Sequence, residues 1–305
     1  MSTPGQGVIH DKLIPGEIEL SEHRYRPSMS QEGLSPTHPV TALDEQGRLR
    51  QVHVAGESPL TLYVDGREIV TLMTLGTHPE ALTIGYLRNQ RFIQELKQIK
   101  DVSVNWRSES VHVSTWDGIA GWDEKLKKRT VTTGCGQGTV FSCTLDALYT
   151  VRLPEVSVHQ SMIYGLLDNI RQQNEIYKRA GAVHGCGLCL HTDILLFVED
   201  VGRHNAADAI AGSMWLEYLA GADKIFYTTG RLTSEIVMKT AQMGIPVLLS
   251  RSGVTNMGLE LAQELGVIMI ARAKGKHFLV YNGAEHIIYD ARPQEPHHKD
   301  YKRHS

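Results

Sequence analysis

The stretch ILLFVEDVGRHNAADAIAGSMWLEYLAG (residues 194–221) decides the fold of the second half of the chain. Its first seven residues form a short apolar run typical of a buried strand, and the stretch from Arg203 onward is typical of a helix. The pattern continues downstream, with apolar runs at 224–230, 246–250 and 267–272 and helical segments at 232–244 and 254–266. Because strands alternate with helices over short connections, the sequence predicts an α/β core with a mostly parallel sheet flanked by helices.

Upstream of this core the pattern is different. Two alternating, β-branched runs flank the Asp-Gly pair at 65–66, which is a strong hairpin signal, and residues 102–106 and 110–116 form a second expected strand pair. Residues 78–93 approximate one face of a helix. The sequence therefore predicts a smaller β-rich N-terminal region with one helix.

The chain is expected to divide into four parts. Residues 1–56 are rich in Pro, Ser, Gly and charge and predict a poorly ordered arm. A β-rich region follows over residues 57–153, then the α/β core over 154–290, which begins with an expected long amphipathic helix at 156–181. A polar tail closes the chain at 291–305.

The composition is that of a soluble globular protein. Of the 305 residues, 41% are hydrophobic and 21% charged, and the net charge of −3 leaves no basic excess for binding nucleic acid or a membrane surface. The sequence has no stretch of eighteen apolar residues and no recognisable secretory signal. A cytoplasmic location is therefore expected, where the four cysteines serve catalysis, metal binding or burial rather than disulfides.

One cysteine, Cys135, lies between glycines in TTGCGQGTVFSC (residues 132–143). A glycine-rich turn exposes a side chain, and its backbone amides can stabilise an anion, so such a thiol can have a lowered pKa and act as a nucleophile. Cysteine is also a common buried apolar residue. The local sequence leaves both interpretations open.

The single Cys-x-x-Cys motif is formed by Cys186 and Cys189. One such pair is a weak zinc signal, and the surrounding residues predict a strand. Side chains alternate between the two faces of a strand, so these cysteines are expected to point to opposite faces and to be buried.

Polar residues follow several of the expected core strands. EDVGRHN (199–205) comes after the first, TTGR (228–231) and SRSG (250–253) come after the next two, and a basic turn (272–277) comes after the last. The carboxyl ends of parallel strands share one edge of a sheet, so these segments predict one crevice in which Arg203, Arg231 and Arg251 face an anionic ligand.

Taken in order, six segments resemble the formate dehydrogenase accessory sulfurtransferase family (FdhD). The resemblance covers roughly residues 58–290 and rests on the following segments: HPEALTIGYLRNQRFI, TGCG, GAVHG, EDVGRHNAADAIAG, TTGRLTSEIVMKTAQMGIPVLLSRSG and KGKHFLVYNGAEHI. It implies a core fold like that of cytidine deaminases and a homodimer.

The resemblance also implies a function. Members accept sulfur as a persulfide from a cysteine desulfurase and pass it to the molybdenum cofactor, in its bis(molybdopterin guanine dinucleotide) form, before the cofactor enters formate dehydrogenase. The persulfide-bearing cysteine matches Cys135. The cofactor-binding turn matches the following residues: Arg272, Ala273, Lys274, Gly275, Lys276 and His277. No structural metal is expected.

The chain departs from the family pattern at two positions. Gly138 stands where many members have a second cysteine, and Arg272 stands where an aromatic residue is common. The sequence therefore predicts a one-thiol sulfur carrier. Two alternatives are a non-catalytic chaperone for the molybdenum cofactor and a zinc-dependent hydrolase resembling deaminases. The latter carry His-x-Glu with Pro-Cys-x-x-Cys, and neither His184-Gly185-Cys186 nor any cysteine pair here matches that pattern.

Overall fold

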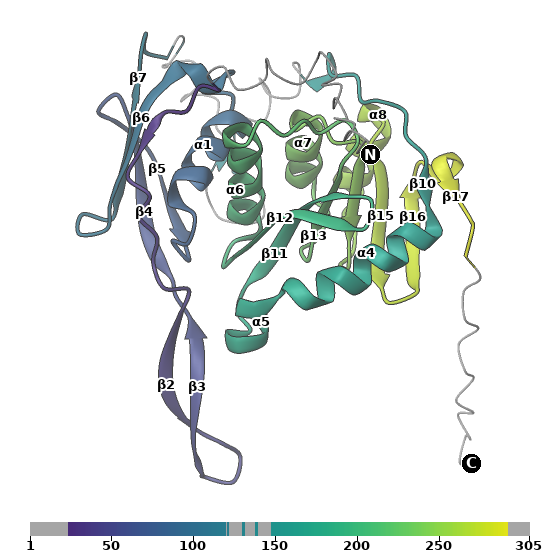
Figure 1. Cartoon of the computed structure of the whole chain (residues 1–305), viewed down its shortest axis with the longest axis horizontal. Coiled ribbons are helices and arrows are strands. Elements are labelled where there is room, and N and C mark those ends of the chain that lie inside the picture. The colour runs from purple at the N-terminus through teal and green to yellow at the C-terminus, as the bar shows by residue number, and fades with distance from the viewer. Residues whose placement is uncertain (1–23, 120, 122–129, 132–137, 140–147, 292–305) are drawn as a thin grey trace, which may run out of the picture.

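The structure is a computed structural model that describes residues 24–119, 121, 130–131, 138–139 and 148–291. Two sheets dominate it, one in each half of the chain (Figure 1). No helix in these residues is long and apolar enough to cross a membrane.

The N-terminal half contains the expected β-rich region. Its sheet has the strand order β1-β6-β7-β4-β5. The strands are β1 (Ser28–Met29), β4 (Ser58–Val64), β5 (Arg67–Thr74), β6 (Ile99–Asn105) and β7 (Ser110–Thr115). Asp65 and Gly66 both have positive φ angles, of 48° and 78°, as the predicted two-residue hairpin turn requires. Helix α1 (Pro79–Asn89) packs on this sheet, and the 3₁₀ helix η1 (Leu96–Gln98) precedes β6.

The C-terminal half contains a six-stranded sheet of order β12-β11-β13-β14-β15-β16. The strands are β11 (His184–Leu190), β12 (Asp193–Asp200), β13 (Ile225–Thr228), β14 (Val247–Ser250), β15 (Ile268–Lys274) and β16 (His277–Asn282). Only the β13–β14 and β14–β15 pairings are parallel, and the other three pairings of this sheet are antiparallel.

The prediction of a mostly parallel sheet is therefore wrong, and the sheet is mixed. Two-residue turns connect β11 to β12 and β15 to β16, and such short connections produce antiparallel hairpins because a parallel pair needs a crossover. The predicted likeness to cytidine deaminases stays a prediction.

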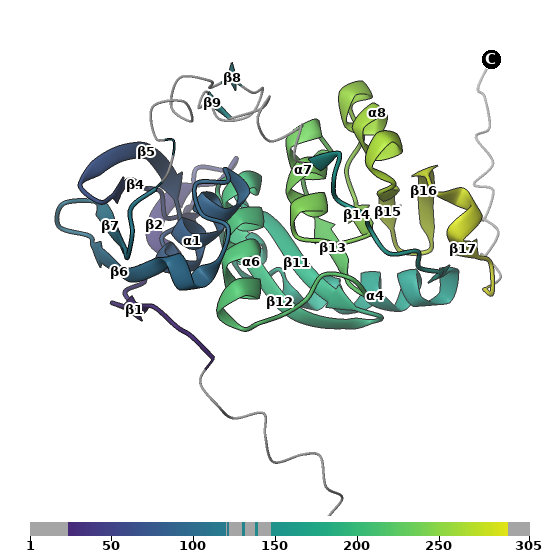
Figure 2. The ribbon, with the colours of Figure 1, turned by 90° about the horizontal axis from the view of Figure 1, so that it is seen from above.

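Helices cover both faces of the six-stranded sheet (Figure 2). Helices α6 (Arg203–Leu216), α7 (Ser234–Gln242) and α8 (Asn256–Leu265) lie on one face, and α4 (Gln160–Gln173) lies on the other. Neighbouring strand residues alternate between two cores, so that Phe226 packs in the core on the α6–α8 side and Tyr227 in the core on the α4 side. The short strands β10 (Val158–His159) and β17 (Ile287–Ile288) pair in parallel beside η2 (Ala284–His286).

Two segments differ from the expected local structure. The helix predicted over 156–181 divides at Asn174 into α4 and the short α5 (Glu175–Ala180). Within the expected poorly ordered arm, β2 (Thr37–Leu43) and β3 (Leu49–Ala55) form a hairpin that projects from the body of the molecule (Figure 1). Its turn is held by the Asp44 carboxylate, which accepts hydrogen bonds from two backbone N–H groups. The overall composition of residues 1–56 does not reveal this local hydrogen bonding.

Two short strands lie on either side of residues 132–137 in the sequence. β8 (Thr130–Val131) and β9 (Gly138–Thr139) pair antiparallel. Figure 2 shows both on the side of the six-stranded sheet that carries α7 and α8, opposite α4.

The two halves meet where α1 crosses α6 with their backbones in contact. A Cβ atom added to Gly85 would lie 1.7 Å from the carbonyl oxygen of Asp208, and one added to Gly212 would lie 1.9 Å from that of Ala81. Arg88 of α1 donates a hydrogen bond of 2.8 Å to the carbonyl oxygen of Ala211. Glycine is therefore required at both positions of this crossing.

We expect the substitution Gly212→Ala to lower the free energy of unfolding by roughly 2 kcal/mol, because the methyl group would force the two helices apart. In an uncrowded helix the same change would raise stability by about 0.5–1 kcal/mol, so the sign of the effect is informative. Urea denaturation measures it. Gly253→Ala is the control, since nothing lies within 4 Å of that Cβ position, and a Gly212→Ala variant at least as stable as wild type would contradict the close crossing.

Candidate functional site

A cavity of about 630 Å³ opens on the α4 side of the six-stranded sheet. Its volume lies in the range usual for small-molecule sites. The cavity lies between the α4–α5 segment and the ends of β13, β14 and β15, and we call it the main pocket. The residues lining it are Leu167, Ile170, Arg171, Asn174, Tyr177, Tyr227, Arg251, Ala273, Lys274 and Gly275.

The wall of the main pocket combines aromatic rings with cations. The guanidinium carbon of Arg251 lies 5.3 Å from the centroid of the Tyr177 ring, which is a cation–π contact. Arg171 and Lys274 add two further positive charges to the lining. Such a wall can stack against a planar ring and pair with phosphate oxygens.

His184, at the start of β11, lies close to the arginines that follow the neighbouring strands. Burial lowers the pKa of His184, and the positive charges of Arg203, Arg251 and Arg231 lower it further. The Arg203 side chain packs against Gly230: a Cβ atom added to Gly230 would lie 2.6 Å from Cδ of Arg203. The structure thus brings together the three arginines expected from the sequence. Of these three described residues, only Arg251 lines the main pocket.

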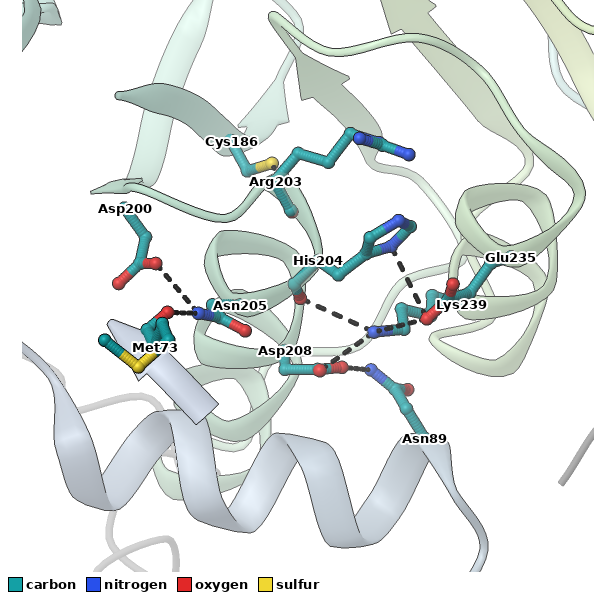
Figure 3. Close-up of polar contacts among 10 residues, drawn as sticks. All are labelled: Met73, Asn89, Cys186, Asp200, Arg203, His204, Asn205, Asp208, Glu235 and Lys239. Carbon is teal, nitrogen blue, oxygen red and sulfur yellow. Dashed lines mark hydrogen bonds and ion pairs between the residues drawn. The ribbon is translucent and has the colours of Figure 1, made fainter. Parts of the chain in front are cut away.

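Most of the EDVGRHN segment is used for structure. Asp200 accepts hydrogen bonds from Thr74 Oγ1 and from the backbone N–H groups of Leu75 and Gly202. It also accepts one from Asn205 Nδ2, which donates to the carbonyl oxygen of Met73 as well (Figure 3). Burial raises the pKa of Asp200, while these hydrogen bonds oppose the rise. This carboxylate therefore ties the end of β5 to the start of α6.

A second buried network lies beside the first and is centred on Lys239 (Figure 3). Its Nζ atom lies 2.8 Å from Asp208 Oδ2 and 3.4 Å from Glu235 Oε1, and Asn89 Nδ2 donates to Asp208 Oδ1 at 2.7 Å. Burial opposes the charge on Lys239, but Asp208 and Glu235 outweigh it and raise the pKa of Lys239. The network therefore stabilises the junction of α1, α6 and α7.

His204 borders this network in its neutral form. Its Nδ1 atom lies 3.5 Å from Glu235 Oε1, and burial lowers the pKa of His204 to about 3. Neighbouring Lys239 and Arg203 add to this lowering, whereas Glu235 opposes it.

The predicted cofactor-binding turn divides between two cavities. Ala273, Lys274 and Gly275 line the main pocket, whereas Lys276 and His277 line a separate cavity of about 380 Å³ beside Tyr164, Phe278 and Tyr289. Arg272 is exposed with a φ angle of 51°, in a bulge between β15 and β16. The residues of this turn therefore do not all line one cavity.

The predicted catalytic residue, Cys135, lies outside the described residues. Cys186 and Cys189 are buried and pack in the two cores on opposite faces of the sheet, as strand alternation predicted. Burial raises the pKa of each of these thiols to about 12. Among the described residues, no group of three or more His, Cys, Asp or Glu side chains is placed to hold a metal ion.

Sequence reasoning missed the pocket residues of the α4–α5 segment, above all Tyr177. The segment reads as one helix because its apolar spacing continues past the break. Asn174, a weak helix former, was the available signal for an interruption.

The fold and site define a mixed α/β protein with a cationic, aromatic pocket beside its main sheet. The profile of the FdhD/NarQ family matches residues 55–288, and the chain belongs to this family. It is 29% identical to the sulfur carrier protein FdhD of Listeria monocytogenes serotype 4b over 80% of this chain and 95% of that relative. It is also 29% identical to the protein of that name from Bacillus subtilis, over 80% of this chain and 94% of the relative.

A solved structure of a similar protein has a similar fold. The crystal structure described as that of a formate dehydrogenase accessory protein from Desulfotalea psychrophila superposes with a TM-score of 0.66 at 26% identity. The match covers 83% of this chain and 98% of that one.

We expect His204 to make the folded protein sensitive to acid. Its pKa in the folded state lies below its ordinary value of 6.5, so the stability that neutral His204 contributes is complete above that pH and is lost as the pH falls toward 3. Between pH 7 and pH 5, wild type should lose roughly 2 kcal/mol more of its unfolding free energy than His204→Gln. Urea denaturation of both proteins at each pH measures the difference, and equal losses would show that His204 is not buried in its neutral form.

Proposed function

We propose that this chain is a sulfur carrier for formate dehydrogenase with sulfurtransferase activity. Cys135 accepts persulfide sulfur from a cysteine desulfurase and transfers it to the molybdenum cofactor before insertion. The support is membership of the FdhD/NarQ family together with relatives named sulfur carrier proteins. The glycines around Cys135 suit an exposed thiol that exchanges sulfur.

The loading step conserves atoms and electrons. The Cys135 thiolate attacks the terminal sulfur of the desulfurase persulfide, a new S–S bond forms, and the desulfurase cysteine leaves as a thiolate. Cys135 then carries one additional sulfur atom. The chain is further proposed to act in the cytoplasm as a homodimer.

The cofactor is the substrate, and the main pocket is proposed to hold one guanine nucleotide end of it. Tyr177 and Tyr227 offer rings for the base, and Arg251, Arg171 and Lys274 offer charges for the phosphates. The pocket lies on the α4 side of the sheet, whereas β8 and β9 lie on the opposite side (Figure 2). The main pocket therefore suits a nucleotide end of the elongated cofactor that lies far from β8 and β9. This pocket is the single observation that carries this part of the proposal.

A second candidate is a non-catalytic chaperone that binds and delivers the cofactor. Gly138, which replaces the second cysteine of many family members, favours it. In that case Cys135 only shapes its loop.

We expect wild type to gain one sulfur atom on Cys135 when it is incubated with a cysteine desulfurase and cysteine, and Cys135→Ala to gain none. Intact-mass spectrometry and peptide mapping measure this. In a host that depends on this chain, Cys135→Ala should also abolish formate dehydrogenase activity, with Cys189→Ala as the matched thiol control. Full activity of Cys135→Ala would exclude the carrier, and an unmodified but required Cys135 would favour the chaperone.

We expect Arg251→Ala to weaken the binding of guanosine 5′-diphosphate by about tenfold, because a charge-assisted contact to phosphate is lost. Isothermal titration calorimetry measures the affinity. Lys178→Ala, which removes an exposed charge from α5 outside the pocket lining, should bind as wild type does. Absence of binding by wild type would reject the main pocket as a nucleotide site.

A further inference from the structure

Tyr177, which lines the main pocket beside residues of α4, belongs to a helix with little stability of its own. Helix α5 has six residues and none of them is buried. An isolated helix of this length is unstable in water, because too few hydrogen bonds follow its costly first turn. The position of α5 therefore depends on its contacts with other elements. These are the β2–β3 hairpin, where Arg179 Nη2 lies 3.1 Å from His53 Nε2, and the groups that hold its first turn.

Glu199 holds the first turn of α5. Its Oε2 atom accepts a hydrogen bond of 2.8 Å from the backbone N–H of Ile176, and its Oε1 atom accepts one of 2.9 Å from that of Tyr177. The Glu199 residue is only 6% exposed, although it lies near the end of β12 and far from α5 in sequence. A buried carboxylate at a helix N-terminus accepts hydrogen bonds from the free N–H groups there. Its negative charge also interacts favourably with the positive end of the helix dipole.

The strand opposite Glu199 supports the same junction. Gly185 is the cross-strand partner of Glu199, and a Cβ atom added to it would lie 3.3 Å from Asn174 Oδ1. Asn174 is buried at the break between α4 and α5, where its Nδ2 donates to the carbonyl oxygen of Ile170. The break between α4 and α5 therefore packs directly against the Gly185–Glu199 pair of strands β11 and β12.

Tyr177 connects Glu199 to the main pocket. The backbone N–H of Tyr177 is fixed by Glu199, while its ring contacts the Arg251 guanidinium. Tyr177 and Arg251 line the main pocket, whereas Glu199 is absent from the described lining. Glu199 therefore acts on the pocket through another residue.

We propose that Glu199 is a positioning residue for nucleotide binding: by capping α5 it fixes the Tyr177 ring, and with it the Arg251 side chain, in the wall of the main pocket. The inference rests on the proposed function, in which this pocket holds a guanine nucleotide. It assigns a ligand-related role to the first residue of EDVGRHN, while Asp200 and Asn205 hold the two halves of the chain together.

The test uses the full chain and guanosine 5′-diphosphate as the probe in isothermal titration calorimetry. Glu199→Gln keeps the size of the side chain but replaces one acceptor oxygen with a donor, and it should weaken binding roughly tenfold. Glu175→Gln is the matched control, because Glu175 is an exposed acidic residue in the first turn of the same helix. It should change the affinity less than twofold.

A double-mutant cycle separates positioning from a general loss of structure. In the Tyr177→Ala background, Glu199→Gln should weaken binding by less than about twofold, since the residue through which it acts is gone. Equal losses in both backgrounds, or wild-type affinity of Glu199→Gln, would overturn the positioning role. If wild type itself does not bind the probe, the main pocket is not a nucleotide site and this inference fails with it, whereas the sulfur carrier role is decided separately by the mass of Cys135.

Hydrogen exchange gives a readout that needs no ligand. In Glu199→Gln, the peptide covering residues 174–181 should exchange faster, while peptides from β13 and β14 keep their protection. Unchanged protection of residues 174–181 would show that Glu199 does not hold α5 and would overturn the proposal whatever the affinity.

Discussion

The rest of the structure depends on the backbone contact between α1 and α6. Gly85 and Gly212 leave no room for a Cβ atom, so the two helices approach more closely than side chains would allow. This approach lets Asn89 reach the buried Asp208 and lets Arg88 reach the carbonyl oxygen of Ala211. Burial lowers the pKa of Arg88 to about 10, and its guanidinium lies over the Trp215 ring. The crossing thereby locks the β-rich half onto the α/β core.

The buried charges at this junction explain why the densest polar motif of the chain is mainly structural. Asp200 joins β5 to α6, and Lys239 joins α6 to α7 through Asp208. Removing one partner of such a network leaves an uncompensated charge, which costs far more than loss of a surface pair. The ends of β13, β14 and β15 form one side of the main pocket. Its other side is formed by the α4–α5 segment, in which α5 has no buried residue.

Several features of the fold and site were predictable because they depend on short-range patterns. The hairpin at Asp65-Gly66, the strands of the core and the opposite orientations of Cys186 and Cys189 follow from turn chemistry and period-two alternation. Other features depend on contacts between distant residues. The antiparallel direction of β11, the break at Asn174 and the division of residues 273–277 between two cavities are of this second kind. The local signals for them, such as the weak helix former Asn174, do not settle the outcome without the partners that folding supplies.

The sequence by itself determined the α/β alternation, the motifs of the FdhD/NarQ family and the presence of arginines after successive strands. Only the tertiary structure decided which polar residues line the main pocket and which are buried in the junction. The physical reason is that Glu199, Asp200 and Arg203 are neighbours in sequence but differ in what surrounds them. Glu199 meets the free N–H groups of α5, Asp200 meets the end of β5, and the Arg203 side chain packs against Gly230. A side chain's role follows from these partners, and folding alone brings them together.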